Sequence, residues 1–86
     1  MIRLEIYSNP ENCPACRRME PIYEELSKEF PTIFVDLSTD DGIEIAGRNN
    51  IRSMPTLVIY KDSVIENVLM GAMPEAKIRE AINEIL

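Results

Sequence analysis

The sequence has no histidine, only two cysteines, and nine basic residues against fifteen acidic ones. A secreted mini-protein stapled by disulfides would carry more cysteines. The resulting charge of −6 argues against nucleic acid as a partner, because phosphate binding needs clustered Lys and Arg. No apolar run is long enough to span a bilayer, so we expect no membrane partner. The start lacks a signal-peptide core, and we therefore expect a cytoplasmic protein.

The chain length of 86 residues fits a single domain, residues 1–86, with a small core. The hydrophobic content of 45% is ordinary for a folded globular protein and argues against disorder. There is no internal repeat, low-complexity tract or linker that would divide the chain. We expect it to be a monomer.

Hydrophobic periodicity predicts the order β-α-β-α-β-β-α. Alternating or continuous apolar runs predict strands, stripes at helical spacing predict helices, and Asp62-Ser63 predicts a hairpin turn. The continuous run Ile33-Phe34-Val35 predicts a strand covered on both faces. The expected product is an α/β fold with a four-stranded mixed sheet and helices on both faces. The strands are expected near 2–7, 33–35, 56–60 and 64–69, and the helices near 14–30, 38–50 and 74–85.

Cys13 and Cys16 form a C-x-x-C motif at the predicted start of the first helix. Pro14 suits the first helical position, which places Cys13 at the N-cap. A helix N-terminus offers unpaired N–H groups and a partial positive charge, and both stabilise a thiolate. Only the thiolate attacks a disulfide, so Cys13 is the predicted nucleophile and Cys16, more interior, the resolving thiol. We expect Cys13 to be the exposed member of the pair.

Two other readings of this cysteine pair remain open. Zinc needs about four ligands, and a chain with no histidine and no second cysteine pair reaches that number most simply by bridging a dimer. A structural disulfide closing so short a loop would restrain the unfolded chain little. We therefore expect no metal site and no cofactor beyond the redox-active disulfide itself.

The chain resembles the thioredoxin superfamily over nearly its whole length. Cys13-Pro14-Ala15-Cys16 looks like the active-site motif, and Pro21 sits where thioredoxins carry a helix-kinking proline. Met54-Pro55-Thr56 looks like the cis-proline signature, and Gly71-Ala72 resembles the loop that completes the substrate groove. The length is similar to that of the short thioredoxin- and glutaredoxin-like proteins of the archaeal type.

This resemblance implies a minimal thioredoxin fold and a thiol–disulfide oxidoreductase that reduces protein disulfides. It implies that the backbone of Met54 pairs with an extended substrate. The donor would be a thioredoxin-reductase-like or other dithiol protein. The substrate-binding residues would be Pro14, Ala15, Met54, Pro55, Gly71 and Ala72.

Some positions depart from the thioredoxin pattern. Asn12 replaces the usual tryptophan, and Tyr7 stands where thioredoxins place a buried aspartate that assists the second cysteine. Glu5 or a water molecule is the expected substitute for that acid. The alternatives to a thioredoxin-like reductase are a glutathione-dependent glutaredoxin and a non-catalytic binding module. Against glutaredoxin, that family has no proline matching Pro21, and Pro74 removes an N–H where glutathione would bind.

Overall fold

The computed structural model describes all of residues 1–86. Its four strands form one mixed sheet in the order β2-β1-β3-β4, in which β1 and β2 are parallel and the other pairs antiparallel. The predicted β-α-β-α-β-β-α order is confirmed. No helix is long and apolar enough to cross a membrane. The elements are β1 (Ile2–Ser8), α1 (Pro14–Glu29), β2 (Thr32–Asp36), α2 (Asp40–Arg48), β3 (Thr56–Lys61), β4 (Val64–Met70) and α3 (Glu75–Ile85).

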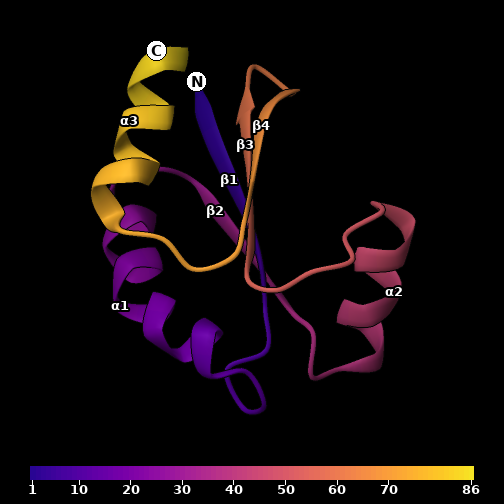
Figure 1. The fold of residues 1–86 in the computed structure, drawn as a ribbon. Coiled ribbons are helices and arrows are strands. Elements are labelled where there is room, and N and C mark those ends of the chain that lie inside the picture. The colour runs from indigo at the N-terminus through magenta and orange to yellow at the C-terminus, as the bar shows by residue number, and fades with distance from the viewer.

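Helices lie on both faces of the sheet, with α1 and α3 together on one side and α2 alone on the other (Figure 1). The alternation of β1 directs every second side chain toward α1 and α3. Those side chains join apolar residues of β3 and of the two helices in the main core. Its buried members are Ile2, Leu4, Ile6, Met19, Tyr23, Leu26, Leu57, Ile59, Ile78 and Ile82.

Helix α1 begins as the sequence predicts. Cys13 is its N-cap and Pro14 its first residue. Pro21 lies inside the helix on its exposed side and does not interrupt it, so α1 continues to Glu29. The proline has no N–H to give to the preceding turn, but packing of the buried stripe holds the helix together on both sides of it. Pro31 follows the end of the helix.

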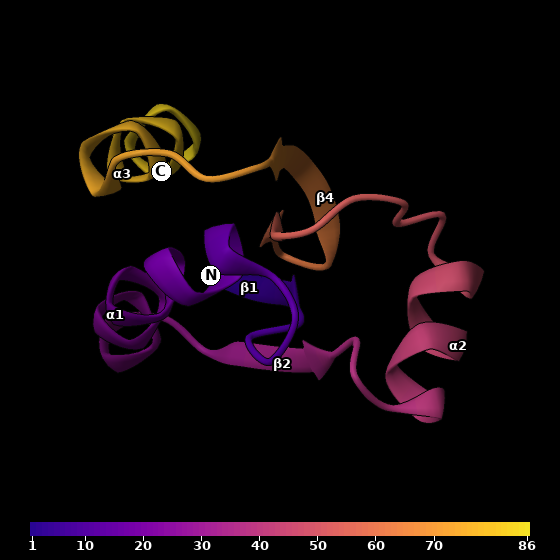
Figure 2. The same cartoon turned by 60° about the horizontal axis from the view of Figure 1, so that its bottom comes forward.

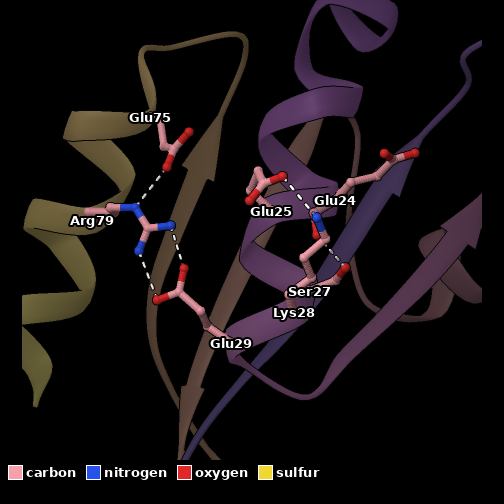
Figure 3. A network of polar contacts seen from close by, with 7 residues as sticks. All are labelled: Glu24, Glu25, Ser27, Lys28, Glu29, Glu75 and Arg79. Atoms are coloured by element: carbon pink, nitrogen blue, oxygen red, sulfur yellow. Dashed lines mark hydrogen bonds and ion pairs between the residues drawn. The ribbon is translucent and has the colours of Figure 1, made fainter.

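An ion-pair bridge joins α3 to the end of α1 (Figure 3). The Arg79 Nε–H donates to Glu75 one turn earlier on α3, at 2.8 Å. The rest of the guanidinium pairs with both carboxylate oxygens of Glu29, in the last turn of α1. A planar guanidinium facing a carboxylate with two parallel hydrogen bonds sets direction as well as distance. The bridge therefore links α3 to the last turn of α1 at the surface.

Strand β2 differs from the prediction that it is covered on both faces. It pairs only with β1 and forms an edge of the sheet. Ile33 and Phe34 are 50% and 56% exposed, and only Val35 is buried. A continuous apolar run indicates burial only where neighbouring elements exist to provide it, and the outer edge of β2 has none.

Helix α2 covers the other face near the end of β2. Thr39 caps it by accepting a hydrogen bond from the Gly42 N–H at 3.0 Å. A Cβ at Gly42 would lie 1.8 Å from the Asp36 carbonyl oxygen, so glycine is what lets the helix approach the strand so closely. The apolar cluster beneath α2 has only four buried members, Tyr7, Val35, Ala46 and Val58.

The predicted hairpin is confirmed. Asp62 and Ser63 both have positive φ, 52° and 72°, as a two-residue turn with the twist of β-strands requires. The hairpin returns the chain along β4, so that Met70 pairs with Thr56. The turn therefore fixes where the segment after β4 re-emerges, beside the start of β3.

Candidate active site

Three loops meet at one end of the sheet. Tyr7 near the end of β1 pairs with Thr56 at the start of β3, and Thr56 pairs with Met70 at the end of β4. The loop leading to Cys13, the segment ending at Pro55 and the segment after β4 therefore share this end, which Figure 2 shows turned toward the viewer. It is also the carboxyl end of the parallel pair β1 and β2, where α/β sheets place their chemistry.

Cys13 occupies the helix start in the geometry of a cap. Its sulfur accepts a hydrogen bond from the Cys16 N–H at 3.1 Å. Burial raises the pKa of Cys13, but hydrogen bonds from the Cys16 thiol and from the N–H groups of Cys16 and Ala15, together with the charge of Arg17, outweigh it. The net pKa of Cys13 is lowered, which favours the thiolate.

The cap geometry also corrects one prediction. Cys13 is only 9% exposed, because its sulfur folds back over the first turn of α1 and does not point into solvent. It is still the more accessible thiol, since Cys16 is completely buried. A disulfide partner must therefore reach Cys13 along a restricted approach.

Cys16 has the opposite electrostatic setting. Burial and its hydrogen bond to Cys13 raise the pKa of Cys16, whereas the Asn9 N–H and the Ser8 hydroxyl lower it without reversing the sign. The Asn9 N–H lies 3.5 Å from the sulfur. Both cysteines are free thiols. The pair thus holds one thiol tuned toward the thiolate and one kept protonated.

The predicted substrate-binding residues lie in the first turn of α1 and in two of the segments that meet at this end. Pro14 and Ala15 lie between the two cysteines, Pro14 exposed and Ala15 half-buried. The Met54–Pro55 peptide bond is cis, with Pro55 buried and Met54 43% exposed. Gly71, at φ 91°, donates its N–H to the Pro55 carbonyl at 2.7 Å. This bond holds Gly71 and the adjacent exposed Ala72 beside the proline segment.

Glu5 does not take the place of the missing buried acid. Its carboxylate accepts hydrogen bonds from the Tyr7 and Tyr60 hydroxyls at 3.1 and 2.9 Å and pairs with Arg3. Tyr7 accepts a further hydrogen bond from Asn49 at 2.8 Å. The Glu5 carboxylate is engaged by Tyr7, Tyr60 and Arg3 and makes no hydrogen bond to Cys16.

The sequence alone assigns no role to Ser8 and Asn9, which follow the first predicted strand. In the structure Ser8 ends β1, and both residues are buried against Cys16. The sequence does contain a signal for Ser8. It continues the strand alternation of Ile6, which places its side chain on the face toward α1. The structure contains no group of three or more Cys, Asp or Glu side chains placed to hold a metal.

The thioredoxin family model matches residues 4–84. The chain belongs to the thioredoxin family. Its relatives include thioredoxin of Pyropia yezoensis, 32% identical over 76 residues that make up 86% of this chain and 71% of the relative. Thioredoxin 1 of Plasmodium falciparum is 37% identical over 67 residues, which cover 77% of this chain and 64% of that relative. The chain thus spans just under two thirds of the second protein.

Solved thioredoxins share the fold. The Plasmodium falciparum thioredoxin structure matches with a TM-score of 0.79 at 30% identity, covering 99% of this chain and 82% of that one. Oxidised thioredoxin O2 of Arabidopsis thaliana matches with a TM-score of 0.83 at 20% identity over 99% of this chain and 75% of its own, a likeness of fold alone. The chain is a thioredoxin-like dithiol–disulfide oxidoreductase with Cys13 and Cys16 close together in a C-x-x-C motif.

Proposed function

We propose that Cys13 attacks the disulfide of a protein substrate and that Cys16 resolves the resulting mixed disulfide. The observation that carries these roles is the opposite tuning of the two thiols. The pKa of Cys13 is lowered by hydrogen bonds and charge that outweigh burial, and that of Cys16 is raised by burial first. A nucleophile must be a thiolate before substrate arrives, whereas a resolving thiol needs to react only afterwards.

The reaction transfers two electrons from the dithiol to the substrate. The Cys13 thiolate forms a bond to one substrate sulfur, and the other substrate sulfur leaves and takes up a proton. Cys16 then loses its proton and attacks the Cys13 sulfur. The Cys13–Cys16 disulfide forms, the bond from Cys13 to the substrate breaks, and the second substrate thiol is released.

Substrate binding is assigned to the loops that meet at Cys13. The exposed backbone and side chain of Met54 offer an edge on which an extended segment can pair, and a flexible thioether suits varied apolar partners. Ala15 and Met73, both half-buried, extend this apolar rim. Together with Pro14, Pro55, Gly71 and Ala72, these residues favour a protein substrate.

The proposed electron donor is a thioredoxin-reductase-like or other dithiol protein, with glutathione a poor substitute. A glutathione site needs donors placed for two carboxylates. Pro74, the N-cap of α3, has no N–H and provides no side-chain cap, and Glu75 adds a carboxylate in the first turn. The overall charge of −6 opposes the same anion. We further propose a cytoplasmic monomer, residues 1–86 as one domain, without metal or cofactor.

The roles of the two cysteines are tested by trapping. Cys16→Ser should accumulate a mixed disulfide between Cys13 and a protein substrate such as insulin, because no thiol remains to resolve it. Cys13→Ser should accumulate none. Intact-mass spectrometry of both variants reads the result. A trapped adduct on Cys16 alone would reverse the roles, and failure of the unaltered protein to turn insulin over with dithiothreitol would favour a non-catalytic binding module.

The donor is tested by a coupled assay with two arms. One arm supplies thioredoxin reductase with NADPH, and the other supplies glutathione with glutathione reductase and NADPH. We expect turnover of insulin in the first arm and little in the second. Rapid turnover in the glutathione arm alone would move the protein to the glutaredoxins.

A further inference from the structure

Ser8 carries a buried hydroxyl without a partner. The residue is 8% exposed, and its Oγ is the one buried side-chain oxygen or nitrogen in the structure that makes no hydrogen bond. A buried hydroxyl left unpaired costs free energy, so its retention needs a reason. The Ser8 carbonyl, in contrast, accepts the Leu37 N–H at 2.9 Å. The hydroxyl is therefore the unpaired group at this residue.

The neighbour of this hydroxyl is Cys16. The Ser8 hydroxyl lies near enough to Cys16 to lower the pKa of its thiol, yet it makes no ordinary hydrogen bond in the dithiol state. In that state the Cys16 thiol donates to the Cys13 sulfur. Once Cys13 is joined to substrate, its sulfur is no longer a thiolate and is a much weaker acceptor. The nearby oxygen of Ser8 is then the acceptor that remains.

A cleft borders Ser8. It has a volume of about 400 Å³ and lies between α1 and the strands β1 and β2. Ser8 is one of its lining residues, along with Tyr23 of α1 and Phe34 of β2. Three carboxylates also line it, Glu20, Glu24 and Asp36. The cleft is large enough to hold several water molecules.

We propose that Ser8 is the positioning residue for the resolving step. The Cys16 proton passes through the Ser8 hydroxyl to water in this cleft. The inference rests on the roles proposed for Cys13 and Cys16. In the mixed disulfide, Cys16 gives its proton toward Ser8 Oγ while the Ser8 hydroxyl gives its own to water. A hydroxyl is both donor and acceptor, so it then donates to the Cys16 thiolate. The thiolate attacks Cys13, and the proton leaves through the cleft.

The titratable groups around Cys16 assign this task to no other side chain. On α1 and its cap these are Cys13 and Tyr23, and burial raises the pKa of Tyr23 well above its usual value, so that its hydroxyl stays protonated. Glu20 and Glu24 of α1 and Asp36 of β2 line the cleft beside Ser8. On β1 and β3, Glu5, Tyr7 and Tyr60 are engaged with one another on the opposite face of the sheet.

Stopped-flow mixing with the aromatic disulfide DTNB tests the proposal, because attack and resolution each release one coloured thiolate. The first phase depends on DTNB concentration and reports Cys13, and the second is unimolecular and reports Cys16. Ser8→Ala should leave the first phase unchanged and slow the second by about tenfold at neutral pH, the loss of thiolate that a one-unit rise in pKa produces. The midpoint of the second phase should move to higher pH by the same amount.

Ser8→Thr keeps the hydroxyl and should restore the second phase. Tyr7→Phe removes a neighbouring hydroxyl from the opposite face and should change neither phase. A normal second phase and pH profile in Ser8→Ala would overturn the proposal, as would a Ser8→Thr variant as slow as Ser8→Ala. The proposed cysteine roles fail separately, in a first phase that survives Cys13→Ser.

Discussion

The two faces of the sheet are built in different ways. On the α1 and α3 side, ten buried apolar residues form the main core under two helices. On the α2 side, the apolar cluster has four buried members, and the area beside it carries the hydrogen-bonded network of Glu5, Tyr7 and Tyr60. Arg3 closes this network by lying over the Tyr60 ring at 4.0 Å. One face is held together by apolar packing, whereas the other relies in part on hydrogen bonds and an ion pair between polar side chains.

The two faces of the sheet should contribute differently to the stability of the protein. Hydrophobic burial is the dominant stabilising term in a chain this small, so the α1 and α3 face should supply most of the free energy of folding. Cys16 sits on that face, at the start of α1, and is held by the same packing. The α2 face instead fixes the far end of β2 and the segment leading to Met54. Substitutions on the two faces should therefore differ in how much they change the free energy of unfolding and in which property of the protein they affect.

The largest effect is expected in the main core. Leu26 on α1 is fully buried, and Leu26→Ala should lower the free energy of unfolding by about 2–5 kcal/mol through lost burial and the cavity left behind. Val68→Ala, on an exposed position of β4, is the control and should change it by less than about 0.5 kcal/mol. Urea denaturation measures both. Equal losses in the two variants would contradict the contrast between the faces.

The next effect concerns the approach of α2 to β2. In Gly42→Ala the new methyl group would meet the Asp36 carbonyl oxygen at 1.8 Å, so the helix must move away. We expect a loss of about 1–3 kcal/mol, typical of overpacking. Gly47→Ala, in the same helix with nothing within 4 Å, should instead stabilise the protein by roughly 0.5–1 kcal/mol through helix propensity. Thermal unfolding of the pair checks the opposite signs.

A smaller effect is expected from the polar network. Tyr7→Phe removes the hydroxyl that donates to Glu5 and accepts from Asn49. The loss should be about 1 kcal/mol, the net worth of an ordinary hydrogen bond, since the half-buried Glu5 can recruit water. Tyr60→Phe should cost a similar amount. A loss as large as that of Leu26→Ala would show that the network, too, is a main source of stability.

The smallest effect is expected at the bridge between α1 and α3. Arg79 lowers the pKa of Glu29 through hydrogen bonds and charge, so the stabilisation is present above the ordinary Glu pKa. It is lost as the pH falls through the lowered pKa of Glu29, where the carboxylate becomes protonated. Glu29→Gln should therefore melt at a lower temperature than the unaltered protein at neutral pH, and this difference should shrink toward low pH. Melting temperatures measured at several pH values check this. Glu80→Gln, exposed on α3, is the control.

Reading the sequence succeeded where local chemistry decides the structure. The seven elements, the Asp62-Ser63 turn and the N-cap position of Cys13 follow from periodicity, turn residues and the proline at position 14. The roles of Cys13 and Cys16 are predictions that trapping tests.

The sequence-based predictions failed where contacts between residues far apart in the chain decide the structure. The exposure of Ile33 and Phe34 depends on β2 being an edge, which a short apolar run cannot reveal. The burial of Cys13 depends on its sulfur folding over the helix start. Strand alternation puts Glu5 on the face of Tyr7, but its hydrogen bond with Tyr60 depends on which strands are neighbours in the sheet.

The cap at the start of α1 makes the first helical turn a reporter of turnover. The Cys16 N–H is held by the Cys13 sulfur, and that sulfur changes its bonding at every stage of the proposed cycle. Protection of this amide against hydrogen exchange should be greatest when the sulfur is an anion and weakest when it is bonded to substrate. One amide proton would thus record the oxidation state of the protein, without a label on either sulfur.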